Sequence, residues 1–152
     1  MDYVRMTEEH LYNYRMIKTS IANMQNFIDT ELEPRGLSAI RYDKSVVQVG
    51  KGESMVERDA IRLAEKATEV KENIKRNKRI VKAIDRCVGQ LPSRAKTIII
   101  MKYIESKKTW PEISDEIGYS VRQCKRINCA AIHRIAIGLY GADAIDSTNG
   151  EE

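Results

Sequence analysis

The side chains best suited to binding a ligand lie in and around the segment TWPEISDEIGYSVRQCKRI, residues 109–127. Arginine pairs in bidentate fashion with O6 and N7 of guanine, and glutamine with N6 and N7 of adenine, each at roughly 1–3 kcal/mol of discrimination. Lysine is better suited to contact phosphates, which position a protein on DNA without specifying a sequence. We therefore expect a contact with double-stranded DNA. Its candidate residues are Lys107, Lys108, Thr109, Ser120, Val121, Arg122, Gln123, Lys125, Arg126 and His133.

A helix that starts at Ser120 has one apolar side and one basic side, at 100° per residue. The apolar side comprises Cys124, Ile127, Ala131 and Ile135, and the basic side comprises Arg122, Arg126, Cys129 and His133. Arg122 and Arg126 are four residues apart near the helix start. Like charges at this spacing repel by a few tenths of a kcal/mol, and the helix dipole disfavours cations there. An anionic partner therefore explains the arginine pair better than folding does.

Two helix starts and one turn are expected to position these residues. Thr109 and Glu112 form a capping box, in which side chains satisfy free amides at the helix start, and Ser120 and Gln123 form another. Gly118 supplies a left-handed turn between the two helices. Two capped helices joined by the short turn Gly118-Tyr119-Ser120 have the outline of a helix-turn-helix motif.

The residue spacing within this segment also fits the motif. In the helix-turn-helix unit of about twenty residues, the ninth is glycine and the fifth is small, which are Gly118 and Ser114 here. The apolar positions of the unit hold Ile113, Ile117, Tyr119, Cys124 and Ile127. Two core helices that bind nothing can share this pattern, but the basic outer side and the caps favour DNA binding.

Upstream, the apolar spacing predicts two long helices. Apolar residues recur every three or four positions over residues 7–32, and a heptad seam runs over residues 54–91 with Asn77 as its polar member. The seam comprises Val56, Ala60, Leu63, Ala67, Val70, Ile74, Asn77, Val81, Ile84, Val88 and Leu91. It can pair with the first helix or with a second copy of the chain, so a homodimer through residues 54–91 stays open. A buried helix is expected over residues 93–106.

The charge distribution indicates the same C-terminal third of the chain. Of 152 residues, 26 are basic and 22 are acidic, which gives a net charge of +4. Residues 91–141 hold nine basic and four acidic side chains, net +5, and residues 142–152 hold four acidic ones. This distribution favours a polyanionic partner, although solvated helix faces can also carry such charge.

Other classes of protein are disfavoured. No apolar stretch is long enough to span a membrane, and the N-terminus has no secretory signal. The three cysteines are not in CxxC spacing, which fits a reducing cytoplasm. We expect no enzyme activity, no cofactor and no metal, since Cys129 and His133 supply two ligands where a structural zinc needs four. A packed Cys129 and an exposed or DNA-facing His133 are expected instead.

Residues 91–139 resemble region 4 of bacterial sigma factors, with a leading helix LPSRAKTIIIMKYIE, then W-x-E-I-S-x-x-I-G-Y-S and a basic helix. The run KTWPEISDEIGYSVRQCKRI is most similar to phage transcriptional regulators of the ArpU and RinA type, and YDKSVVQVGKGES is similar to their N-terminal part. The resemblance implies a prophage-encoded activator of late genes. It also implies DNA contacts at Ser120, Arg122, Gln123, Lys125 and Arg126. Because the chain has no promoter-melting region, we expect it to act by recruitment, with host RNA polymerase as a second partner.

The sequence thus predicts an all-α protein of the bacterial cytoplasm in three parts. Residues 1–90 form a helical hairpin or coiled coil with a connector at residues 33–52. Residues 91–141 form a sigma-region-4-like helix-turn-helix domain, and residues 142–152 form an acidic tail. Two rival functions stay open: a small terminase-like subunit of phage DNA packaging, and a region-4-like module that binds RNA polymerase with little DNA affinity of its own.

Overall fold

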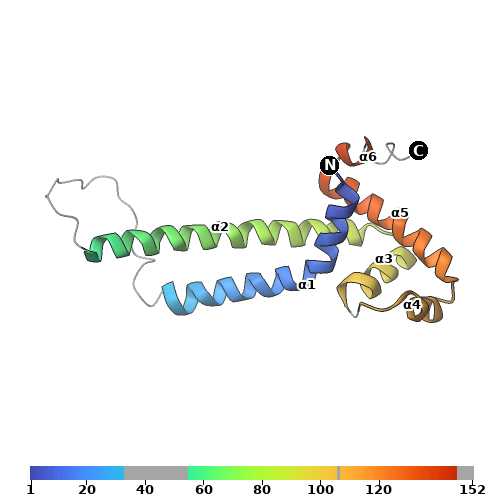
Figure 1. The fold of residues 1–152 in the computed structure, drawn as a ribbon, viewed down its shortest axis with the longest axis horizontal. Coiled ribbons are helices and arrows are strands. Elements are labelled where there is room, and N and C mark those ends of the chain that lie inside the picture. Colours follow the sequence, from blue (N-terminus) through green and yellow to red (C-terminus); the bar gives the residue numbers. More distant parts are fainter. Residues whose placement is uncertain (33–54, 106, 147–152) are drawn as a thin grey trace. The chain divides into compact units, whose positions relative to one another are not determined.

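The computed structural model describes residues 1–32, 55–105 and 107–146, and every regular element within them is a helix (Figure 1). In chain order these are α1 (Tyr3–Phe27), η1 (Ile28–Leu32), α2 (Met55–Gly89), α3 (Ser93–Ile99), η4 (Ile100–Ile104), α4 (Trp110–Ile117), α5 (Val121–Tyr140) and α6 (Asp143–Asp146). The elements η1 and η4 are π-helical turns. The all-α prediction is confirmed for this part of the chain, in which no strand occurs. The expected connector at residues 33–52, residue 54 at the start of the expected seam, and residues 147–152 of the expected tail lie outside the described residues.

The described helices belong to two compact units. The first unit comprises Met1–Lys18 and Arg79–Glu152, and the second comprises Thr19–Lys78. Both α1 and α2 contribute to each unit, because the division falls within these two helices. The beginning of α1 and the last turns of α2 therefore share a unit with α3 to α6.

In the second unit, the apolar seam of α2 packs against the end of α1 and against η1. The buried side chains are Ile28, Leu32 and Ile74, and those packed around them are Ile21, Met24, Phe27, Leu63, Ala67 and Val70. Asn77, the polar member of the seam, donates a hydrogen bond from Nδ2 to Oγ of Ser20 at 3.3 Å. This part of the seam thus finds apolar and polar partners within its own chain.

The core of the first unit brings together residues that are far apart in the sequence. Its fully buried aliphatic side chains include Leu11, Ile84, Ile98, Ile99, Ile113 and Ile135. The Tyr14 hydroxyl donates to Oδ1 of Asp85 at 2.5 Å, and the Tyr103 hydroxyl donates to Oε1 of Glu8 at 3.1 Å. These two bonds connect α1 to α2 and to η4, so α1 is part of the support for the C-terminal helices.

Two helices differ from their expected bounds. The first begins at Tyr3 rather than Thr7, because Oδ1 of Asp2 caps it by accepting a hydrogen bond from the Arg5 amide at 3.0 Å. Thr7 lies buried within α1. The helix expected over residues 93–106 is a regular α-helix only to Ile99. It then widens into η4, where the Glu105 amide donates to the Ile100 carbonyl at 2.8 Å.

The first residues of the expected acidic tail, residues 142–152, are helical. Gly141 ends α5 with φ 74°, and the Ala144 amide donates to the Gly141 carbonyl at 3.2 Å as the chain turns into α6. Ala144 is only 2% exposed. Burial of this small side chain and contact with α5 therefore order residues 143–146 as a short helix.

Candidate nucleic-acid interface

The start of α4 is fixed by the predicted pair of Thr109 and Glu112. The Thr109 amide donates to Oε2 of Glu112 at 2.7 Å, and the Thr109 hydroxyl donates to the same oxygen at 2.9 Å. The bond from the amide lowers the pKa of Glu112 most, and the bond from the hydroxyl lowers it further. The positive charge of Lys108 adds to this effect. Pro111 lies in the first turn, where a missing amide hydrogen breaks no helical bond.

The turn between α4 and α5 has the conformation predicted from its residues. Gly118 ends α4 in the left-handed region with φ 77°, and its amide donates to the Ser114 carbonyl at 2.9 Å. Oγ of Ser114 donates to the Tyr119 carbonyl. Ser120 then caps α5, because its Oγ accepts a hydrogen bond from the Gln123 amide at 3.2 Å. The left-handed glycine and the serine cap are both confirmed.

Beneath this turn lies one apolar cluster that contains every predicted apolar position of the segment. Its buried members are Ile98, Met101, Ile113 and Cys124, and Trp110, Ile117, Tyr119 and Ile127 pack against them. The cluster joins α3 and η4 to α4 and α5. Its burial fixes which side of α5 faces inward, and therefore which side faces solvent.

The outer side of α5 carries the candidate side chains. Arg122, Gln123, Lys125 and Arg126 are exposed, and Val121 is half-buried. Within residues 1–32, 55–105 and 107–146, no hydrogen bond or ion pair engages the side chain of Arg122, Lys125 or Arg126. Three cations therefore occupy the first two turns of α5 with no internal partner among the described residues.

Cys129 and His133 lie farther along α5. The expectation of a packed cysteine is wrong, because Cys129 is exposed while Cys124 is the buried cysteine of this helix. Cys124 and Cys129 are five residues apart, which turns them to different sides. His133 is half-buried rather than fully exposed. The described residues contain no group of three or more potential metal ligands.

The lysines before α4 are engaged with other side chains. Lys108 forms an ion pair with Glu116 of α4, and its amide donates to the Met101 carbonyl at 3.0 Å. Lys107 has a positive φ of 46°, and its ammonium lies 5.8 Å from the centre of the Tyr12 ring. Thr109 is occupied as the cap of α4. These three residues hold the entry to α4 in place, whereas Arg122, Lys125 and Arg126 have no such contact among the described residues.

Arg94 joins this surface although sequence spacing gives no direct sign of it. Its guanidinium lies 4.5 Å from the centre of the Tyr119 ring, in the turn between α4 and α5. Arg94 is in the first turn of α3, where the helix dipole disfavours a cation just as it does for Arg122. That local mismatch is the one sequence signal that marks Arg94.

Asn128 is a second residue that the sequence pattern does not single out. It lies on the inner side of α5, is 6% exposed, and donates from Nδ2 to the Tyr103 hydroxyl at 3.0 Å. Because the Tyr103 hydroxyl donates in turn to Glu8, a chain of hydrogen bonds connects α5 through η4 to α1. Burial raises the pKa of Tyr103, so this hydroxyl keeps its proton and remains a donor.

Comparisons with protein-family models, with curated proteins and with solved structures find no match to this chain. No helix among the described residues is long and apolar enough to cross a membrane.

Proposed function

We propose that this protein is a sequence-specific double-stranded-DNA-binding transcriptional regulator, in which α4 and α5 form a helix-turn-helix and α5 reads the major groove. The observation that carries the proposal is the group of exposed, unpartnered cations in the first two turns of α5. Arg122 and Arg126 oppose the helix dipole and each other, and no acid among the described residues compensates them. Phosphates and guanine edges supply that compensation.

The dimensions of an α-helix such as α5 support this assignment. An α-helix with its side chains is about 10–12 Å across, and the major groove is about 12 Å wide. In helix-turn-helix proteins the N-terminal residues of the second helix contact base edges, and the first helix crosses the backbone. By position, Arg122, Gln123 and Arg126 contact bases. Lys125, Ser120 and Arg94 contact phosphates and thereby set the register on the duplex.

The resemblance of residues 91–139 to region 4 of sigma factors, and of the 108–127 run to ArpU- and RinA-type regulators, supports a narrower role. In that role the protein binds near promoters of phage or prophage late genes and recruits host RNA polymerase in the bacterial cytoplasm. Residues 1–90 then form a helical hairpin that presents the DNA-binding helices. Packing of the α2 seam against α1 within one chain is consistent with a monomer or a small oligomer.

The proposal is tested by selecting bound sequences from a pool of random duplexes with the full chain. The affinity for the enriched duplex is then measured for the wild type and for Arg122→Ala/Arg126→Ala. Since each bidentate base contact is worth roughly 1–3 kcal/mol, the double variant should bind at least about thirtyfold more weakly. Its salt dependence should also be shallower. The matched control is Arg62→Ala/Lys66→Ala, which removes an exposed arginine and lysine at the same spacing from α2.

The proposal is wrong if no sequence is enriched, or if the α5 variant and the control bind the enriched duplex with equal affinity and equal salt slope. The oligomeric state in solution separates the proposal from its rival in DNA packaging. A ring of eight or more copies would indicate a small terminase-like subunit, and a monomer or dimer fits a regulator.

A further inference from the structure

The last turns of α2, which lie in the first unit, carry a second group of cations outside the α4–α5 pair. Arg79, Lys82 and Arg86 are exposed, and none has a hydrogen bond or ion pair within the residues that the structure describes. Asp85 is the only acidic residue from Arg79 to Gln90, and its Oδ1 accepts the hydrogen bond from Tyr14. These three cations therefore repel one another at spacings of three and four residues, with little local compensation.

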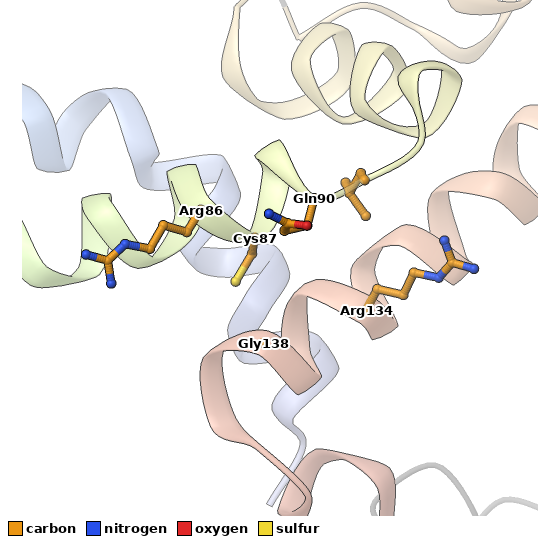
Figure 2. A pocket seen from close by; sticks show the side chains of 6 residues that line it. Arg86, Cys87, Gln90, Arg134 and Gly138 are labelled. Atoms are coloured by element: carbon orange, nitrogen blue, oxygen red, sulfur yellow. The ribbon is translucent and has the colours of Figure 1, made fainter.

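Two shallow pockets place Arg86 and Arg79 beside the C-terminal half of α5, and Lys82 lies between these two residues in the sequence of α2. Arg86 lines a pocket of about 250 Å³ with Cys87, Gln90, Leu91, Arg134 and Gly138 (Figure 2). In this view the side chains of Arg86 and Arg134 extend to opposite sides of the pocket, so the two guanidinium groups do not converge on one point. Arg79 lines a pocket of about 240 Å³ with His10, Ile80, Ala83, Leu139 and Tyr140.

The helices α2 and α5 approach each other closely at Cys87 and Gly138. A Cβ atom added to Gly138 would lie 2.5 Å from Sγ of Cys87, so a larger residue there would force the thiol to rotate or the helices to separate. The two helices can therefore approach until Arg134 on α5 and Arg86 on α2 border the same pocket. The result is an exposed basic surface, defined by Arg79, Lys82, Arg86 and Arg134, which we call the α2–α5 basic surface.

Arg134 connects this surface to the base-reading side of α5. It follows Gln123 by eleven residues, which is three helical turns, so the two side chains leave α5 on nearly the same side. The separation along the helix axis is ~16 Å at 1.5 Å per residue. This exceeds the width of the major groove, so a helix whose start lies in the groove brings Arg134 to the neighbouring phosphates.

We propose that the α2–α5 basic surface binds the phosphate backbone of the same duplex that α5 reads; this inference rests on the proposed function. Separated guanidinium and ammonium groups suit a row of phosphates better than a single small anion, because duplex DNA carries one negative charge per ~1.7 Å of axis. Helix-dipole stabilisation accounts only for Arg86, which lies in the last turn of α2. Lys82 and Arg79 are farther from the helix end.

The test measures binding of the full chain to a fluorescein-labelled duplex of 40 base pairs and mixed sequence, over a range of salt concentrations. Lys82→Gln/Arg86→Gln removes two cations of the surface, and Arg62→Gln/Lys66→Gln removes the same two residue types at the same spacing elsewhere on α2. Loss of two phosphate contacts should reduce the slope of log K against log salt by about 1.8 and weaken binding about tenfold. Arg134→Gln should reduce the slope by about 0.9, and the Arg62/Lys66 control should match the wild type.

The outcomes separate this inference from the proposed function. If the wild type shows no salt-dependent binding to the duplex, both fail. If Arg122→Ala/Arg126→Ala weakens binding while Lys82→Gln/Arg86→Gln behaves like the Arg62/Lys66 control, only the α2–α5 basic surface is overturned. The α2–α5 basic surface is also overturned if Lys82→Gln/Arg86→Gln loses binding to host RNA polymerase but keeps its affinity for the duplex. The surface would then contact protein rather than DNA. Far-UV circular dichroism and thermal melting establish that each variant is folded.

Discussion

The cations around the α4–α5 turn differ in whether they have a partner inside the chain. Lys108 is paired with Glu116, and the guanidinium of Arg94 lies on the Tyr119 ring. Arg122 and Arg126 have no such contact among the described residues. A side chain that has no contact within the protein breaks no such contact when it turns toward a ligand. These two arginines are therefore the ones whose removal should affect binding without affecting the fold.

Gly118 and Gly89 form a matched pair for testing how the turn depends on backbone conformation. An added Cβ meets no atom within 4 Å at either glycine, but only Gly118 has a positive φ, 77°. Gly118→Ala should lower the free energy of unfolding by about 1–2 kcal/mol, because an L side chain strains the left-handed region. Gly89→Ala, at the end of α2, should leave it unchanged or raise it by up to about 1 kcal/mol. Urea denaturation followed by circular dichroism measures both.

Equal effects of the two alanines would mean that the turn tolerates an L residue at 118 and does not depend on glycine. In that case DNA affinity should also be unaffected by Gly118→Ala. If Gly118→Ala lowers the free energy of unfolding as expected, it should also lower the affinity for DNA, because Ser120 and the start of α5 directly follow this turn.

At the scale of helices, the contact between α5 and α2 depends on one small residue. Gly138→Ala places a Cβ 2.5 Å from Sγ of Cys87, so the thiol must rotate or the helices must separate. We expect a loss of about 1–3 kcal/mol in the free energy of unfolding, the usual cost of overpacking. Cys87→Ala removes the sulfur and leaves the other nearby atom, Cβ of residue 87, at an ordinary 3.6 Å. Denaturation of the two single variants and the double variant gives the coupling between the two sites.

The double variant Gly138→Ala/Cys87→Ala should recover most of the stability that Gly138→Ala loses. If its loss equals the sum of the two single losses, the contact between Sγ and residue 138 does not govern the packing of α5 on α2. Burial raises the pKa of the Cys87 thiol, so this group stays protonated at neutral pH and no charge complicates the comparison.

Sequence patterns predict α4 and α5 well because the determinants of these two helices are short in range. Gly118 and Ser120 act on residues within one turn, and the buried side of α5 follows from helical spacing. The contact between Arg94 and Tyr119 depends on how α3 packs, which no spacing encodes. The expected packing of Cys129 is wrong because this residue lies on the basic side of α5, which is exposed.

At the scale of the whole chain, residues 1–18 belong to the unit of the C-terminal helices. A division between residues 90 and 91 follows from the sequence because Gly89 and Pro92 interrupt the helical pattern there. The structure instead connects α1 to the C-terminal helices through Tyr14 and Asp85, Glu8 and Tyr103, and a bond of 2.8 Å from Nη1 of Arg15 to the Glu105 carbonyl. A fragment that begins at residue 91 would expose the surfaces that these residues cover.

The hydrogen bond between Tyr14 and Asp85 makes the stability of this unit vary with pH in the alkaline range. Burial, then the hydrogen bond and the charge of Asp85, raise the pKa of Tyr14 from 10.0 to about 12. Because the pKa of Tyr14 is higher in the folded state than in the unfolded state, Tyr14 contributes its full share of the free energy of unfolding below pH 10. That contribution is lost as pH rises through 12. Urea denaturation at intervals from pH 8 to pH 12 should show this decline.

Tyr14→Phe should lower the free energy of unfolding by about 1 kcal/mol at pH 8, because the hydrogen bond is lost, and should show a smaller decline toward pH 12. Parallel curves for wild type and Tyr14→Phe would contradict the assignment, because ionisation of the remaining tyrosines is common to both proteins.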